Sequence, residues 1–316
     1  MEAITREEKI MSGENLTPIT REEMFLAKAA GMDVWVPQPI TRKEIFLSKI
    51  GGSGGGGGGT GGGDSGEEWI GDGKTHLWIN IAAEGRMDVP LCFQQTVANG
   101  VTIDWGDGSA TETLNGTGKK NITHTYAKIG EYVISLDVAD GCTLTLGDNF
   151  TTTIMGSTGI GSQVYLTMLK KVEIGKGVTS IDKSAFSSCR SLGSILISKN
   201  VTNIGDSAFY NCYSLQSIVI PESVTSIGLN AFYACAAFAN VVIPKSVTSI
   251  GGGAFYSCVG MKFYDFTKHT AVPTLDNTSA FKSIPSDCEI RVPADLYDEW
   301  ISATNWSTYA DKIVAV

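Results

Sequence analysis

The fold of this chain is decided by the stretch VTSIGLNAFYACAAFANVVIPKS, residues 224–246. Its Val-Thr-x-Ile and Ala-Phe-x-x-Cys elements recur every 23 residues, in copies that begin at Val178, Val201, Val224 and Val247. A fixed period of this length is typical of a solenoid, whose repeats cannot bury their apolar faces alone and must stack. Solenoids usually present a surface, so the repeats favour recognition over catalysis.

Alignment of the copies by 23 residues separates inward positions from outward ones. Val172 and Ile174, with their equivalents in later copies, alternate with outward residues, which predicts a strand in a stacked parallel sheet. The spacing of apolar residues over 208–215 predicts a short helix that closes each turn. Pro221 and Pro244 are expected to end the strands and to fix the turns that follow.

Two outward columns are candidate binding surfaces. The first column comprises Ser187, Tyr210, Tyr233 and Tyr256, and Tyr213 is taken with it as a ligand-binding candidate. Tyrosine rings and hydroxyls suit glycans or proteins, and the alternative is an aromatic ladder that only supports stacking. The second column lies between inward strand residues and comprises Glu173, Leu196, Val219 and Val242. It is either a contact face or a surface under a loop.

The chain contains seven cysteines, and this odd number argues against a complete disulfide framework. Four of them, Cys189, Cys212, Cys235 and Cys258, share one repeat position. We expect a column of buried, reduced thiols that behave as small hydrophobes, although stacking would also allow an oxidised rung. The spacing does not fit a Cys-x-x-Cys zinc site, and we expect neither a cofactor nor a structural metal.

The repeat pattern V-T-x-I-G-x-x-A-F-x-x-C-x-x-L-x-S-I-x-I-P-x-S resembles the BspA-like class of leucine-rich repeats. Members of that class occur in bacterial and protist surface proteins and in phage-encoded proteins, so the resemblance implies attachment or recognition. The segment from Cys288 to Ser307 resembles the cap that closes such arrays in gut-bacterial and prophage proteins. We assign residues 149–316 to the repeats, with the cap at about 267–316, where Leu296, Trp300 and Ile301 would cover the open core.

Residues 67–148 are expected to be all-β, because apolar runs alternate with turns. Trp105-Gly106-Asp107-Gly108, followed by His124-Thr125-Tyr126, resembles the PKD-type immunoglobulin-like sandwich, although Asp104 precedes the Trp where the family often has Asp after it. The family's domains usually act as spacers or carbohydrate-associated modules. Asp104 and Asp107 are weak calcium candidates, and the favoured alternative is that Asp107-Gly108 is a hairpin turn pair and that Asp104 bonds local backbone amides. His124 is expected to orient a strand pair.

Residues 1–50 contain a looser repeat, in which Ile-Thr-Arg starts at Ile4, Ile19 and Ile40. Each copy predicts a capped helix start. The short helices would carry the docking residues Phe25, Leu26, Phe46 and Leu47. We expect docking to a partner, with a small helical bundle or a frayed tail as alternatives. Residues 51–66 are glycine-rich and predict a flexible linker.

Composition narrows the classes of partner. The net charge is −9, and the sequence contains no block of Lys and Arg, which disfavours nucleic acid and anionic membranes as partners. No stretch is long and apolar enough to predict a membrane span, and the first residues show no signal-peptide core. His76, His124 and His269 lie in no recognised nucleophile motif, so we do not expect an enzyme.

The favoured hypothesis is a non-catalytic phage virion appendage of the tail or head fibre type. Residues 1–50, whose Pro-Ile-Thr-Arg-Glu-Glu pattern resembles segments of phage structural proteins, would dock it to a virion protein. The repeats would recognise a protein or glycan of the host surface, and a homo-oligomer is compatible with the sequence. The alternatives are a bacterial cell-surface adhesin and a structural virion decoration that binds nothing on the host.

Overall fold

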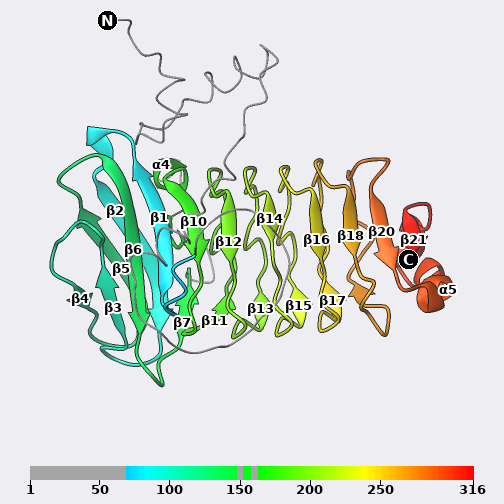
Figure 1. Cartoon of the computed structure of the whole chain (residues 1–316), viewed down its shortest axis with the longest axis horizontal. Coiled ribbons are helices and arrows are strands. Elements are labelled where there is room, and N and C mark those ends of the chain that lie inside the picture. The colour runs from blue at the N-terminus through cyan, green and yellow to red at the C-terminus, as the bar shows by residue number, and fades with distance from the viewer. Residues whose placement is uncertain (1–68, 148–151, 158–162) are drawn as a thin grey trace, which may run out of the picture. The chain divides into compact units, whose positions relative to one another are not determined.

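The structure, a computed structural model, describes residues 69–147, 152–157 and 163–316. Within them, Ile70–Val316 form one compact unit. The docking helices expected in residues 1–50 and the linker expected in 51–66 lie outside the described residues. Figure 1 shows that the unit begins with a group of strands, continues through stacked repeats and ends in a cap.

Two rows of short parallel strands run through the repeats (Figure 1). One row consists of β10 (Leu169–Glu173), β12 (Ser194–Leu196), β14 (Ser217–Ile218), β16 (Asn240–Val242), β18 (Phe263–Asp265), β20 (Glu289–Val292) and β21 (Ile313–Ala315). The other consists of β7 (Leu144–Leu146), β11 (Val178–Ile181), β13 (Asn203–Ile204), β15 (Ser226–Ile227), β17 (Ser249–Ile250) and β19 (Thr274–Leu275). In this second row Ile181 pairs with Ile204, Ile204 with Ile227 and Ile227 with Ile250. One 23-residue period is therefore one turn of the solenoid, as predicted.

A column of phenylalanines fills the core between the two rows. Phe209, Phe232 and Phe255 are completely buried, and neighbouring rings stack with centroids 5.2 Å apart. The column continues to Phe186 at one end and to Phe281 at the other. Burial of each such side chain stabilises the fold by about 1.5–3 kcal/mol, so the column contributes at every repeat.

The short helix expected over residues 208–215 is wrong, because that segment is a series of turns. Ser207 and Asn211 adopt left-handed backbone conformations, with φ of 53° and 58°, which a continuous right-handed helix excludes. Alternate backbone N–H groups bond to the next repeat instead, as where Phe209 N donates to Ala231 O at 2.7 Å. Helical spacing in the sequence thus reflected inward packing of the turn rather than a helix.

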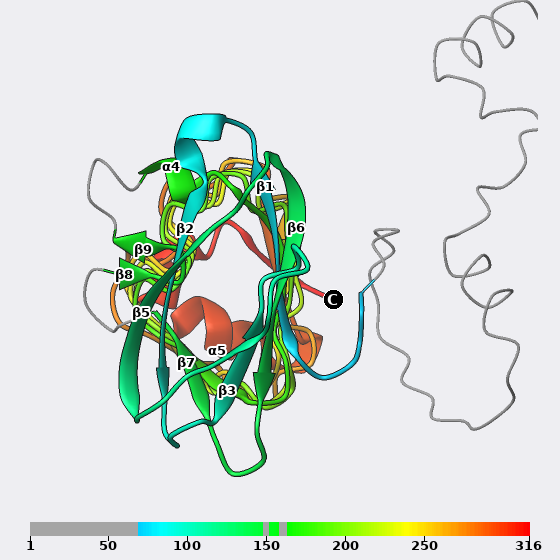
Figure 2. The same cartoon turned by 90° about the vertical axis from the view of Figure 1, so that its left-hand side faces the viewer.

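The N-terminal strands continue the same two layers. They are β1 (Thr75–Ile81), β2 (Asp88–Gln95), β3 (Val101–Asp104), β4 (Glu112–Thr113), β5 (Gly118–Thr125) and β6 (Gly130–Val138). One sheet has the order β14-β12-β10-β1-β6-β3-β4, and the other β19-β17-β15-β13-β11-β7-β2-β5. Figure 2 shows the two layers from the end, with β1 and β6 in one and β2 and β5 in the other. The boundary placed at residue 148 therefore falls within sheets that run on into the repeats.

Helices in the described part of the chain are short. They are η1 (Glu84–Arg86), α4 (Gln163–Leu166), η3 (Ala294–Leu296), α5 (Tyr297–Ser302) and η4 (Trp306–Tyr309). Among the described residues, none of the helices has the length and apolar character needed to cross a membrane. A small hairpin of β8 (Thr152–Thr153) and β9 (Gly156–Ser157) precedes the first repeat, and Ile154 N donates to Ala185 O at its turn.

The C-terminal cap closes the core with two tryptophans, one on α5 and one on η4. Trp300 and Trp306 are completely buried, with ring centroids 4.6 Å apart. Trp306 also stacks obliquely on Phe281, the last ring of the phenylalanine column, and its Nε1 donates to Pro273 O at 2.7 Å. Leu296 and Ile301 pack against the same core. This agrees with the covering role expected for these residues.

Candidate functional site

The turns of four successive repeats lie side by side and form a surface that we call the turn face: residues 184–193, 207–216, 230–239 and 253–262. Backbone hydrogen bonds join each turn to the next, from Phe186 N to Ala208 O and from Phe232 N to Ala254 O, for example. These bonds repeat at every step, so side chains in equivalent positions are held in straight columns. The three tyrosines of the predicted column lie on this face, whereas Ser187, which was expected to face outward with them, is buried.

Tyr210, Tyr233 and Tyr256 are half-buried and stack on one another. Their ring centroids are 4.8 Å apart for the first pair and 4.9 Å for the second, with interplanar angles of 18° and 9°. Burial, together with the neighbouring tyrosines, raises the pKa of the Tyr233 hydroxyl, which therefore stays protonated at neutral pH. The aromatic ladder that was weighed as an alternative is thus present, and it holds hydroxyls and ring edges in a row.

Tyr213 differs from Tyr210, Tyr233 and Tyr256 because the residue is exposed, at 41%. The Arg190 guanidinium carbon lies 5.6 Å from the centroid of the Tyr213 ring. Arg190 and Tyr213 occupy the same position in successive repeats, 23 residues apart, so the sequence period would have revealed this pair. The pair places a cation and an accessible aromatic ring beside the tyrosine column.

The second outward column is not uniform. Val219 and Val242 are exposed, as predicted, at 56% and 47%. Glu173, by contrast, is buried, because its carboxylate accepts hydrogen bonds from Ile70 N and Gly71 N, both at 2.8 Å. The expectation that Glu173 faces outward is therefore wrong, since the chain entering β1 covers it.

The other residues considered in the sequence analysis, Asp104, Asp107 and His124, make local contacts. Asp104 Oδ1 accepts from Gly106 N at 2.9 Å, which confirms that Asp104 bonds a local backbone amide, and Asp107 Oδ1 accepts from Ser109 N at 3.0 Å. Asp107 Oδ2 lies 2.8 Å from His124 Nε2, and the His124 ring stacks on Trp105 at 4.6 Å. Over residues 69–147, 152–157 and 163–316, no group of three or more His, Cys, Asp and Glu side chains could hold a metal ion.

The repeat cysteines are free, buried thiols, as expected. Each thiol after the first reaches a phenylalanine carbonyl of the previous repeat, as Cys212 Sγ does to Phe186 O at 3.1 Å and Cys235 Sγ to Phe209 O at 3.3 Å. Burial raises the pKa of these thiols, to about 12 for Cys258. They are therefore poor nucleophiles at neutral pH and act in packing.

One constellation that the sequence did not suggest joins His76 to Ser135 and Asp72. His76 Nδ1 lies 2.9 Å from Ser135 Oγ, and its Nε2 lies 2.8 Å from Asp72 Oδ1. Ser135 lies within β6, which is paired on both sides by β1 and β3, so the strand presents no free pair of N–H groups for an oxyanion. His76 is only 2% exposed. These contacts hold the segment before β1 on the sheet and do not form a nucleophilic site.

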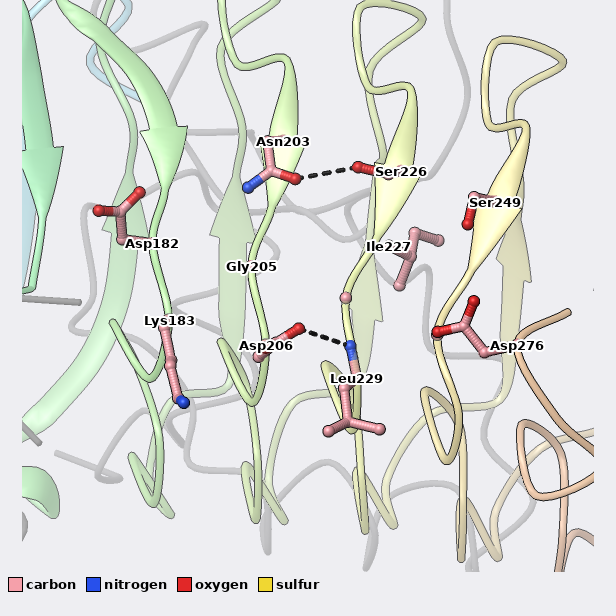
Figure 3. A pocket seen from close by; sticks show the side chains of 12 residues that line it. Asp182, Lys183, Asn203, Gly205, Asp206, Ser226, Ile227, Leu229, Ser249 and Asp276 are labelled. Carbon is pink, nitrogen blue, oxygen red and sulfur yellow. Dashed lines mark hydrogen bonds between the residues drawn. The ribbon is translucent and has the colours of Figure 1, made fainter. Parts of the chain in front are cut away.

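An open groove of about 550 Å³ follows the second strand row and adjoins the turn face (Figure 3). Its lining includes a column of glycines, Gly205, Gly228 and Gly251. The acidic side chains that line it are Asp182, Asp206 and Asp276. Asp206 Oδ1 accepts a hydrogen bond from Leu229 N at 2.8 Å, so this carboxylate already has a structural partner.

Comparison with known proteins identifies the repeats. Residues 159–286 match the family model described as the BspA type leucine rich repeat region, in six copies. No curated protein matched the chain.

Three solved structures resemble the chain in part. A leucine-rich repeat protein of T. pallidum is 35% identical, with 30% of this chain and 44% of that chain covered and a TM-score of 0.29. One from Bacteroides ovatus is 27% identical, covers 54% of this chain and 38% of its own, and has a TM-score of 0.34. The pneumococcal vaccine antigen PcpA is 18% identical, with 47% and 36% covered and a TM-score of 0.38.

The chain thus spans less than half the length of each of these three structures. At such TM-scores the likenesses support no conclusion about function. The family match does not depend on these three structures. The 23-residue period and the stacked strands agree with it. The part of the chain that resembles the BspA type leucine rich repeat family is thus residues 159–286, which is less than half of its length.

Proposed function

We propose that this chain is a non-catalytic recognition protein whose turn face binds a protein or glycan on a cell surface. The observation that carries the proposal is the row of half-buried tyrosines at 4.8–4.9 Å spacing, with the exposed Tyr213 beside it. Tyrosine is enriched at the energetic centres of protein interfaces, because it combines apolar area with a hydroxyl.

Rigidity of the array supports the same proposal. Stacking fixes the tyrosine rings before any ligand arrives, and backbone hydrogen bonds between turns fix the main chain beneath them. A surface that is ordered in advance loses little side-chain entropy on binding. Among the described residues, linked histidine and aspartate side chains occur around His76, together with Ser135, and around His124, together with Asp107 and Ser109. Both sets make local structural contacts.

The setting that we propose is a phage virion. Residues 1–50, with Phe25, Leu26, Phe46 and Leu47, would dock to a virion protein, and residues 51–66 would give the repeats reach. A bacterial cell-surface adhesin is the second candidate, favoured by the BspA-type match, because the family also occurs in surface proteins. A purely structural decoration is the third.

The test is binding of the labelled full chain to a panel of gut bacterial strains. We expect saturable binding to a subset, which the double substitution Tyr210→Ala and Tyr233→Ala weakens. The matched control is Val219→Ala with Val242→Ala, which removes exposed apolar area from another side of the repeats. Equal loss in both variants, or no binding to any strain by the folded chain, would contradict recognition through the turn face.

The proposed docking of residues 1–50 to a virion protein needs a separate measurement. The full chain with Phe25→Ala and Phe46→Ala should keep its cell binding but no longer associate with purified virions of the phage that encodes it. Unchanged association with virions would contradict docking through these residues. Failure to find any such phage, with retained cell binding, would favour the adhesin.

A further inference from the structure

We infer that the turn face binds a linear anionic polysaccharide, with Arg190 and Lys282 at its two ends and the tyrosine hydroxyls and ring edges between them. This inference rests on the proposed function, because it assigns a ligand class to the same face. Three independent observations lead to it: how the rings stack, how charge is distributed, and how the face contrasts with the groove.

Stacking determines which part of each ring a ligand meets. Tyr233 lies between Tyr210 and Tyr256 at 4.8 and 4.9 Å, so both of its faces are covered. The row therefore offers edges and hydroxyls rather than the ring faces on which a neutral sugar stacks. The edge of an aromatic ring is its electropositive part, and a protonated hydroxyl donates hydrogen bonds. Both groups favour electron-rich oxygens.

The turn face differs in charge from the rest of the chain, because it has no acidic residues. The chain carries 33 Asp and Glu residues and a net charge of −9. None of them lies in 184–193, 207–216, 230–239 or 253–262, and these four turns contain Arg190 and Lys262. Arg190 is exposed beside Tyr213 and forms no ion pair among the described residues.

A second exposed cation continues the tyrosine column at its other end. Phe255 stacks on Phe281 at 5.4 Å, and Ser257 N donates to Lys282 O at 2.9 Å, so Lys282 follows Tyr256 in the column. This next turn carries its first carboxylate only at Asp287. The face is thus a row of donors with a cation near each end.

The groove that borders the turn face along the second strand row has the opposite character. Its lining includes Asp182, Asp206 and Asp276 and only one cation, Lys183. An anionic polymer would be repelled there, so the charge pattern directs it to the turn face. The hydroxyl and amide groups of Ser188, Asn211 and Ser257, and of Ser191 and Ser214, suit a ligand rich in hydroxyls, which favours a polysaccharide over an acidic peptide.

The test uses the full chain with four polymers: polygalacturonate and dextran sulfate as anionic probes, and methyl-esterified polygalacturonate and dextran as neutral counterparts. Calorimetry should show binding of the anionic probes that weakens as salt is raised. The neutral polymers should bind at least about tenfold more weakly, as should the variant Arg190→Gln with Lys282→Gln. The control variant, Lys245→Gln with Lys268→Gln, removes the same charge from exposed positions elsewhere and should bind within about twofold of the unaltered chain.

Several results would overturn the inference. They are equal binding of charged and neutral polymers, no effect of the Arg190 and Lys282 substitutions, or poly-L-glutamate binding as tightly as polygalacturonate. If no polymer binds while tyrosine-dependent cell binding persists, the ligand class is wrong and the proposed function stands. If cell binding does not depend on the tyrosines, the proposed function fails whatever the polymers do.

Discussion

The repeats and the N-terminal strands share two continuous sheets, yet they are stabilised in different ways. In the repeats, each core residue packs on copies of itself, as Phe232 does between Phe209 and Phe255. In the N-terminal part each contact occurs once, as where Tyr126 Oη donates to Trp105 O at 2.8 Å. Because its contacts recur, the structure of the repeats can be predicted from the sequence. The single contacts of the N-terminal strands cannot be predicted in this way, because they depend on the fold around them.

Recurring contacts in the repeats and single contacts in the N-terminal strands predict different responses to substitution. Loss of a repeated residue removes contacts with neighbours on both sides and uncouples the turns that it joins. Loss of a single contact has a local effect. Three substitutions, taken from the largest expected effect to the smallest, test this difference.

The largest effect is expected for Phe232→Ala. This ring is completely buried in the middle of the column, so its removal leaves a cavity that rigid stacking cannot close. We expect the free energy of unfolding to fall by about 3–5 kcal/mol. Urea denaturation followed by circular dichroism measures this change.

The matched control is Phe263→Ala, which removes a ring of the same type from the surface. Phe263 is only partly buried, and the Arg291 guanidinium carbon lies over it at 3.8 Å from the centroid. Its loss should cost about 1 kcal/mol or less. Similar losses for the two variants would mean that stacking along the column adds little to stability.

A smaller effect is expected for Glu173→Ala, at the junction of the two regions. The carboxylate accepts hydrogen bonds from Ile70 N and Gly71 N, and water can replace it because both donors belong to exposed residues. We expect a loss of about 1–2 kcal/mol and faster hydrogen exchange at Ile70 and Gly71. Exchange that spreads evenly through the repeats would instead show that the junction controls the whole unit.

The sequence predicted what recurs and missed what occurs once. The period predicted one of the two strand rows, the reduced thiols and the outward tyrosines, because each rests on equivalent positions in three or four repeats. It did not predict that Ile70 and Gly71 cover Glu173, since that contact joins residues about 100 positions apart. The turns were read as helices because inward packing over residues 208–215 has a similar spacing in both conformations.

The smallest effect concerns Asp107→Asn in the N-terminal strands and appears only in its dependence on pH. Hydrogen bonds from Ser109 and His124 hold the pKa of Asp107 at about 2, below its ordinary value of 3.8. A pKa lowered in the folded state means that the ionised carboxylate stabilises the fold above about pH 4. This contribution is lost as the pH falls from about 4 toward 2. We therefore expect the unaltered chain to be more stable than the variant at pH 6, by about 1 kcal/mol, and the difference to shrink toward zero at pH 2.

Thermal unfolding at several pH values measures this difference in stability. A difference that stays constant from pH 6 to pH 2 would show that Asp107 acts through shape and not charge, and the single contacts of this region would then resemble the packing of the repeats.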